Sequence, residues 1–122
     1  MPYQIVDEGD GLVLRISGDV SFEEITAANQ EGWEHPEWDK HQYQIWDFKK
    51  IRTFGVNEED ALLSAYMDNA HTQHTKLIKA AFIADDQTTI NILKAYIAGV
   101  KSENLEAQIF ADETEARKWV SG

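Results

Sequence analysis

Several groups of side chains in this chain are of types that could do chemistry. In the stretch 49–59, three cations, Lys49, Lys50 and Arg52, precede a helix start at Asn57. These cations and the free N–H groups of a helix start could hold a phosphate or another anion. Three acidic residues on the same helix turn would repel that anion, and the chain lacks a glycine-rich phosphate loop. The alternative interpretation is a solvated loop followed by an ordinary helix cap.

Histidines could hold a metal ion at two places. His71 and His74 lie three residues apart in an expected helix, which puts them near one face, as a two-ligand site requires. No third ligand is indicated, and His74 also continues an apolar stripe, so a position at the edge of the core is the alternative. His35 and His41 share a polar connection with several acidic residues. Structural zinc sites show tighter pairs of Cys or His, so we expect no metal and no other cofactor.

Ser64, Asp68 and His71 follow one another at i, i+4 and i+7, which invites interpretation as a hydrolytic triad. The middle of a helix does not present a serine as a nucleophile elbow does, and the chain has no Gly-x-Ser-x-Gly. The acidic residues are scattered over helix caps and surfaces, so no pair of carboxylates stands out for acid–base catalysis. We therefore predict that the protein is not an enzyme.

The four tryptophans fall into two kinds. Trp46 alternates with Phe48 and is predicted to lie in the core, and Trp119 is predicted to pack the last helix down. Trp33 and Trp38 stand in a polar connection, where they are harder to bury. They could line an apolar pocket or a partner surface, since amphipathic aromatic side chains suit both. The alternative is that they pack the connection onto the sheet.

Length and composition bound the class of protein. A chain of 122 residues is enough for one domain, 1–122, and too short for two. The net charge of −11 argues against nucleic acid or an anionic membrane as a partner, because both require a positive surface. No apolar run approaches the roughly 20 residues of a membrane span, and no secretory signal opens the chain. The lack of cysteine suits a reducing compartment, so we expect a cytoplasmic protein.

Two kinds of hydrophobic period alternate along the chain. Short apolar or alternating runs predict strands at 3–6, 12–17, 43–48, 78–84 and 105–110. Helical spacing predicts helices at 22–32, 58–75, 87–99 and 113–120. The stretch 49–55 is predicted as a loop. The order β-β-α-β-α-β-α-β-α therefore predicts an α/β domain with a single mixed, mostly parallel five-stranded sheet and four helices, because a helix between two strands lets them run parallel.

Capping signals mark where the expected helices begin. The stretch 21–24, Ser-Phe-Glu-Glu, is a capping box, and the other three helices open at Asn57, at Asp85-Asp86 and at Asp112. The second helix also carries an apolar stripe with i, i+4 spacing, made of Leu62, Leu63, Tyr66, Met67 and Ala70.

Four stretches carry a resemblance to a known family. They are Gly-Asp-Val-Ser-Phe at 18–22, Trp-Asp-Phe-Lys-Lys-Ile at 46–51, Ala-Phe-Ile-Ala-Asp-Asp at 81–86, and the segment 109–119. In this order they resemble the SpoIIAA-like fold of STAS domains, and more closely a group of small stand-alone bacterial SpoIIAA-like proteins. Anti-sigma-factor antagonists of this family carry an Asp-Ser-Ser-Gly stretch that is phosphorylated. The matching stretch here is 55–58, Gly-Val-Asn-Glu, so the resemblance implies the fold without the phosphorylation switch.

The resemblance implies a non-enzymatic interaction or regulatory module, with a protein partner or a second copy as its target. We expect the binding surface at the end of the middle strand and the following helix start: Arg52, Thr53, Phe54, Asn57 and Glu58. The aromatic excess and the small size lead us to expect a homodimer.

The alternative function is a carrier or sensor of a small apolar ligand, because the fold also resembles that of lipid-carrying CRAL-TRIO domains. Trp33, Tyr66 and Met67 could then face a pocket, and Trp38 could border it.

Overall fold

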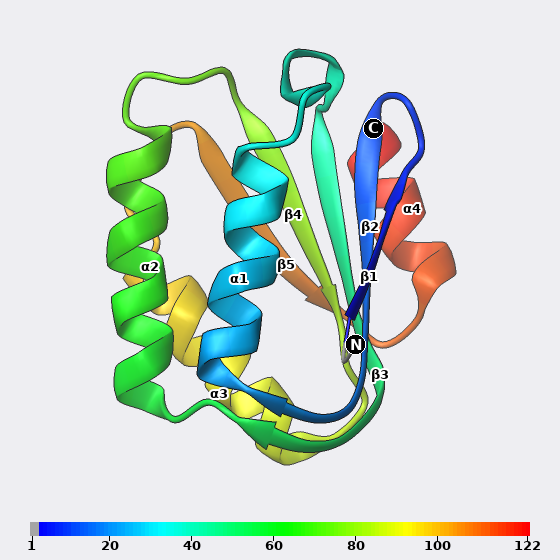
Figure 1. Cartoon of the computed structure of the whole chain (residues 1–122), viewed down its shortest axis with the longest axis vertical. Coiled ribbons are helices and arrows are strands. Elements are labelled where there is room, and N and C mark those ends of the chain that lie inside the picture. The colour runs from blue at the N-terminus through cyan, green and yellow to red at the C-terminus, as the bar shows by residue number, and fades with distance from the viewer. Residues whose placement is uncertain (1–2) are drawn as a thin grey trace.

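The computed structural model describes residues 3–122, which form one five-stranded sheet and four α-helices (Figure 1). The strands are β1 (Tyr3–Asp7), β2 (Gly11–Ser21), β3 (Tyr43–Gly55), β4 (Ile78–Ile83) and β5 (Leu105–Phe110). The helices are α1 (Phe22–Trp33), α2 (Glu58–Thr72), α3 (Gln87–Gly99) and α4 (Glu113–Ser121), and a single 3-10 turn, η1 (Trp38–Lys40), precedes β3. This confirms the predicted α/β class and the predicted order of elements.

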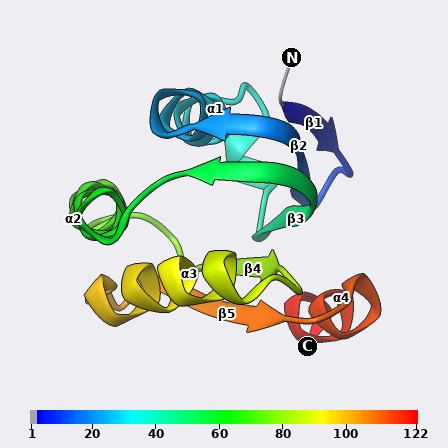
Figure 2. The same ribbon diagram turned by 90° about the horizontal axis from the view of Figure 1, so that it is seen from below.

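The strands lie in the sheet in the same order as in the chain. β1 pairs antiparallel with β2, and the three remaining pairs are parallel. Crossovers that keep one hand and always step in the same direction place their helices on one face of the sheet. Accordingly, α1, α2 and α3 cover one face, and α4, which follows the last strand, covers the other (Figures 1 and 2).

Alternation along the strands divides the core between these two faces. In β2, Leu12, Leu14 and Ile16 pack toward α1–α3, whereas Val13 packs toward α4. Trp46 and Phe48 of β3 belong to the first core, as their alternation predicted. Trp119 packs α4 onto Phe110, also as predicted, with their ring centroids 5.6 Å apart. The first core is the larger one because three helices contribute to it.

Two strands are longer than the sequence predicted. The stretch 49–55 was predicted as a loop and is instead the second half of β3, and β2 continues past Gly18 to Ser21. The two extensions pair with each other, and the register shifts twice between residues 15 and 19 of β2. Gly18 stands at the second shift with a φ of +70°, in the left-handed region that glycine adopts without strain. Each of these two segments is polar and irregular in sequence, and each forms a strand because it pairs with the other.

The caps predicted for the helices are confirmed. Ser21 and Asn57 each form a complete capping box, and Asp86 and Asp112 accept backbone N–H bonds. In the apolar stripe of α2, however, Leu62, Leu63 and Tyr66 are exposed, Tyr66 to 73%. The buried face is made of Ala61, Ala65, Asp68 and Thr72.

Small residues explain why α2 is turned this way. A Cβ atom on Gly99 of α3 would lie 2.9 Å from the Cβ of Ala65, so the two helices touch almost backbone to backbone. A row of larger side chains could not occupy that contact. Leu63 and Tyr66 are consequently left on the solvent side of α2, and Leu62 borders the contact, since its Cδ2 would lie 3.2 Å from the same Cβ atom on Gly99.

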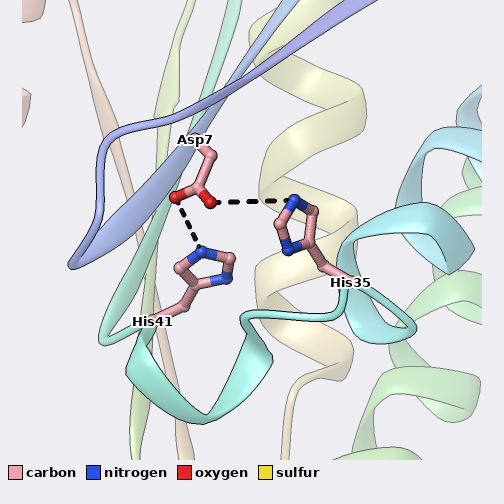
Figure 3. A group of neighbouring side chains, drawn as sticks. All are labelled: Asp7, His35 and His41. Carbon is pink, nitrogen blue, oxygen red and sulfur yellow. Dashed lines mark hydrogen bonds and ion pairs between the residues drawn. The ribbon is translucent and has the colours of Figure 1, made fainter.

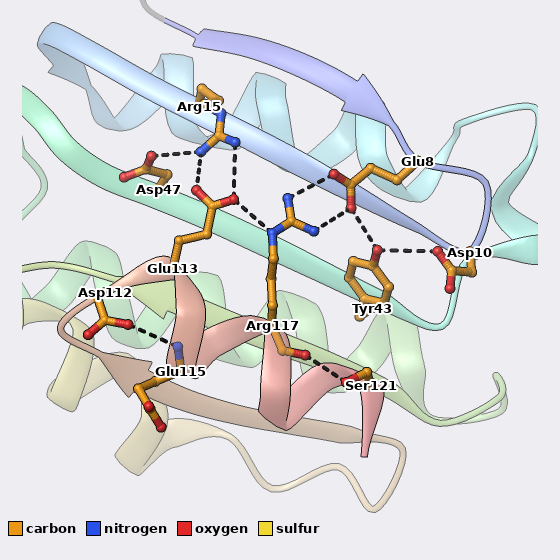
Figure 4. A network of polar contacts seen from close by, with 10 residues as sticks. All are labelled: Glu8, Asp10, Arg15, Tyr43, Asp47, Asp112, Glu113, Glu115, Arg117 and Ser121. Carbon is orange, nitrogen blue, oxygen red and sulfur yellow. Dashed lines mark hydrogen bonds and ion pairs between the residues drawn. The ribbon is translucent and has the colours of Figure 1, made fainter.

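Ion pairs fasten α4 to the second face of the sheet (Figure 4). Glu113 accepts from Arg15 Nη1 of β2 at 2.8 Å and from Arg117 Nε one helical turn on at 2.8 Å. Arg117 continues the chain of contacts to Glu8 at 2.8 Å, in the turn between β1 and β2. The two guanidinium groups hold the pKa of Glu113 at about 2, well below its ordinary value.

Among residues 3–122, no helix has the length and apolar character needed to cross a membrane.

Candidate functional site

An apolar cavity lies between the sheet and the three helices of the first face. Its volume is about 60 Å³, several times the roughly 10–15 Å³ that one water needs. Most of its wall is aliphatic or aromatic, and the aromatic part consists of Trp33, Trp46, Phe48, Phe54, Phe82 and Tyr96. An apolar, aromatic wall with a few polar groups is typical of ligand sites, although these usually measure about 300–1,000 Å³.

A groove between α1 and α2 meets this cavity. The groove measures about 280 Å³ and shares with the cavity the residues Thr26, Asn29, Trp33, Met67 and Asp68. These shared side chains form the boundary between the groove and the cavity. A ligand could therefore reach the cavity by parting α1 from α2, without opening the sheet.

Asp68 is a buried carboxylate at that boundary, only 5% exposed. Its Oδ1 accepts from Asn29 Nδ2 at 2.8 Å and from Trp33 Nε1 at 3.3 Å, and its Oδ2 accepts from Tyr96 Oη at 2.5 Å. All three donors are neutral, and they come from α1 and α3. One acid on α2 thus ties together the helices that enclose the cavity.

Burial governs the electrostatics of this group. Desolvation raises the pKa of Asp68 above its ordinary value, and the three donors oppose that rise by stabilising the ionised form. Burial and the nearby carboxylate likewise raise the pKa of Tyr96. Tyr96 therefore stays a donor, and Asp68 is an acid whose charge is sensitive to its surroundings.

Two polar atoms at the cavity wall have no partner within residues 3–122. Gln44 is 3% exposed, and its Nε2 donates to no acceptor. Its orientation is fixed because its Oε1 accepts from Trp46 Nε1 at 3.1 Å, and an indole nitrogen can only donate. The hydroxyl Oγ1 of Thr26 is also buried without a partner. Buried polar atoms normally have partners, so these two mark the wall as incomplete.

A second cluster joins Asp7, His35 and His41 near the end of β1 (Figure 3). Asp7 Oδ1 lies 3.0 Å from His41 Nε2, and Asp7 Oδ2 lies 3.9 Å from His35 Nε2. Among the described residues this is the one group of three side chains with metal-ligand spacing, all within 4.8 Å of one another. Two histidines and one carboxylate form a known set of metal ligands, so the hydrogen bonds of these side chains must be compared with those that a metal site requires.

Hydrogen bonding opposes a metal at this cluster. His35 Nδ1 accepts the Glu37 N–H at 3.0 Å, so the neutral ring carries its proton on Nε2, the atom that faces Asp7. If His41 ligated through Nε2, its Nδ1 would need to hold a proton, yet Nδ1 is buried without a partner. Metal-bound histidines usually donate that second N–H to an acceptor. The cluster is better described as a clasp between β1 and the connection from α1 to β3.

The residues predicted at the end of the middle strand are bound up in the fold. Arg52 Nε donates to Asp19 Oδ1 at 2.9 Å, and the hydroxyl of Thr53 donates to the same atom at 2.9 Å. Asn57 caps α2 as expected, and Glu58 is an exposed residue of its first turn. Of the three cations suggested for an anion site, Arg52 is therefore already paired with the carboxylate of Asp19. Phe54 is the member of this set that reaches the cavity.

The fold brings Trp33 and Trp38 together, whereas His71 and His74 form no common site. Trp33 lines the cavity and packs edge-on against Trp38 at a centroid distance of 5.0 Å. His71 packs against Trp33 at a centroid distance of 4.6 Å, and both His71 and His74 are exposed. Within the described residues, His71 and His74 belong to no set of three metal-ligating side chains.

The spacing of Ser64, Asp68 and His71 does not produce a triad. Both Ser64 and Asp68 line the cavity, but the hydrogen bonds of Asp68 in the described structure go to Asn29, Trp33 and Tyr96.

No family model, no curated protein and no solved structure matches this chain, so the resemblance to STAS domains stays a prediction.

Sequence reasoning missed the two side chains that give the cavity its polarity. Asp68 was considered only as a triad member, and Gln44 was not considered. The spacing of Ala61, Ala65, Asp68 and Thr72 was the available signal, because small residues at helical intervals indicate a close helix contact and place Asp68 on that buried face.

Proposed function

We propose that this protein is a non-enzymatic binding protein that holds a small, mainly apolar molecule between the sheet and helices α1, α2 and α3. The observation that carries the proposal is the cavity itself, with its aromatic wall and its connection to the groove beside α1 and α2. Transfer of apolar surface out of water would drive binding, at about 25 cal/mol for each Å² of contact. An engineered apolar cavity of about 150 Å³ binds benzene, so the smaller space here would have to widen, by movement of α1 away from α2, to hold a ligand of that size.

Toluene is a suitable first probe because it is apolar and compact. We expect added toluene to shift the amide and methyl NMR signals of cavity residues such as Ile92 and Leu93, and to raise the melting temperature. Native mass spectrometry of freshly purified protein would reveal a ligand that co-purifies. Absence of any shift at saturating toluene, together with a clean mass, would contradict the proposal.

A pair of substitutions on α2 makes this test specific. Ser64 lines the cavity and its hydroxyl makes no hydrogen bond in the described structure, so Ser64→Leu should fill the space and abolish toluene binding. Ala70 is exposed on the same helix and outside the cavity wall, so Ala70→Leu should leave toluene binding unchanged. Equal binding by both variants would place toluene elsewhere.

The exposed stripe of α2 supports a second candidate function, an interaction module that pairs with a protein partner or another copy of itself. Leu62, Leu63 and Tyr66 are 50, 48 and 73% exposed and adjacent on the helix surface. A cluster of this kind on a small domain is typical of an interface. Light scattering would test it: a dimer that Tyr66→Glu converts to a monomer supports the module, and a monomeric wild type counts against self-association.

A further inference from the structure

We infer that the cavity selects an uncharged molecule with a single alcohol or ketone oxygen on an apolar body, and rejects carboxylates. This inference rests on the proposed function, because it specifies what occupies that same cavity. It concerns the two polar side chains of the wall, Gln44 and Asp68, and the charge that a ligand group beside each of them can carry.

Gln44 supplies a donor that the protein leaves unused. Its amide Nε2 carries two N–H groups, is buried and has no acceptor, while Trp46 prevents the amide from turning over. A Cβ atom on Gly32 would come within 2.8 Å of Nε2, so this nitrogen lies against the last turn of α1. An oxygen brought by the ligand would satisfy this donor, which a pure hydrocarbon cannot do.

Charge rules out an acid as the source of that oxygen. None of the described residues that line the cavity is Lys, Arg or His, and Asp68 is the one ionisable acid among them. A ligand carboxylate would have no cation to pair with and would face Asp68 across a medium of low dielectric. The chain as a whole carries a charge of −11, which further disfavours anions.

Asp68 also leaves room for a ligand hydroxyl. An ionised carboxylate has about four acceptor positions, and Asn29, Trp33 and Tyr96 fill three of them. Thr26 adds a buried hydroxyl that can donate or accept. An alcohol, which both accepts and donates, therefore suits the wall at least as well as a ketone.

Three probes of nearly equal shape test the inference: toluene, benzyl alcohol and benzoate at pH 7. We expect benzyl alcohol to bind, and benzoate to bind at least tenfold more weakly. Benzyl alcohol should shift the side-chain amide signals of Gln44, and toluene should not. Gln44→Met should weaken benzyl alcohol about tenfold relative to toluene, because the variant removes the donor and keeps the length of the side chain.

The outcomes separate this inference from the function on which it rests. If toluene binds but benzoate binds as tightly as benzyl alcohol, the inference is wrong and the proposed function stands. The same holds if the Gln44 amide signals do not respond to benzyl alcohol, a result that wild-type protein gives even if Gln44→Met fails to fold. If none of the three probes binds, the proposed function fails with the inference.

Discussion

Tyr96 of α3 donates its hydroxyl hydrogen to Asp68 of α2 across a distance of 2.5 Å, at a point where both side chains are buried. The bond joins the two helices behind the cavity and restrains one oxygen of the acid. Asn29 and Trp33 of α1 restrain the other oxygen. The carboxylate is therefore the shared fastening of the three helices on this face of the sheet.

Removal of the tyrosine hydroxyl should weaken that fastening. Tyr96→Phe is expected to lower the free energy of unfolding by about 2 kcal/mol, because a hydrogen bond to a charged group is lost and the acid stays buried. Urea denaturation at pH 7 measures it. Tyr66→Phe is the matched control, since Tyr66 is 73% exposed on α2 and should change stability little. Equal losses in the two variants would mean that the Tyr96 bond contributes nothing.

Substitution of Asp68 separates its charge from its hydrogen bonds. Asp68→Asn can still accept from α1 and can donate to Tyr96, so we expect stability at pH 7 equal to or above that of the wild type. Asp68→Leu leaves three donors without an acceptor, at a cost of about 1–3 kcal/mol for each. Thermal or urea unfolding of both variants gives the comparison, and a larger loss in Asp68→Asn would contradict the expectation.

The same acid predicts a dependence on pH. Burial raises the pKa of Asp68 in the folded protein above its value in the unfolded chain. Between those two pKa values the folded state binds the extra proton, so the contribution of Asp68 to stability falls as pH rises. The advantage of Asp68→Asn over wild type should therefore be absent below about pH 4 and should grow until the folded pKa is passed. A difference that stays constant with pH would exclude this mechanism.

Glu113 predicts the opposite dependence on pH. Arg15 and Arg117 lower its pKa to about 2, so its contribution is present above the ordinary pKa of a glutamate and is lost as pH falls toward 2. Glu113→Gln should cost about 1 kcal/mol at pH 7, after allowance for solvent screening of a partly exposed side chain, and much less at pH 2, where Glu113 is about half protonated. Glu115→Gln on the same helix is the control. Urea unfolding at the two pH values decides it, and a loss that is undiminished at pH 2 would come from packing rather than charge.

Zinc should not occupy the Asp7, His35 and His41 clasp, because the nitrogens that face Asp7 carry protons. We expect added Zn²⁺ to leave the melting temperature at pH 7 unchanged. A rise that His35→Gln abolishes and His74→Gln preserves would show that the clasp rearranges into a metal site. Differential scanning calorimetry with and without a chelator makes the measurement.

Gly18 offers a test of backbone strain that involves no packing. A Cβ atom added there meets nothing within 4 Å, so the cost of Gly18→Ala comes from its φ of +70° alone. We expect a loss of about 1 kcal/mol in urea unfolding. Gly18→Asn should recover most of it, since asparagine visits this region more readily. No loss in the alanine variant would mean that the strand relaxes to another backbone conformation.

Patterns local in the sequence predicted the fold, and patterns that depend on distant partners did not. The capping box at Ser21 and the alternation in β2 act over a few residues, so the elements and their order could be predicted. The extension of β3 to Gly55 depends on pairing with β2, so it could not be predicted from the residues of β3 alone. For the same reason the role of Asp68 was missed, because its partners are 28 to 39 residues away in the chain. An acid in mid-helix is ordinarily solvated, and only the close packing of α2 and α3 made this one an exception.

The second face of the sheet has a consequence for biosynthesis. Its apolar side chains, Val13, Ile45, Ala81 and Ile83, are covered by α4 through Ala116 and Trp119. Because α4 follows β5 in the chain, a ribosome completes all five strands before the residues that shield this face emerge. The nascent sheet would then present a bare hydrophobic surface, the kind that chaperones recognise and that leads to aggregation when translation stalls.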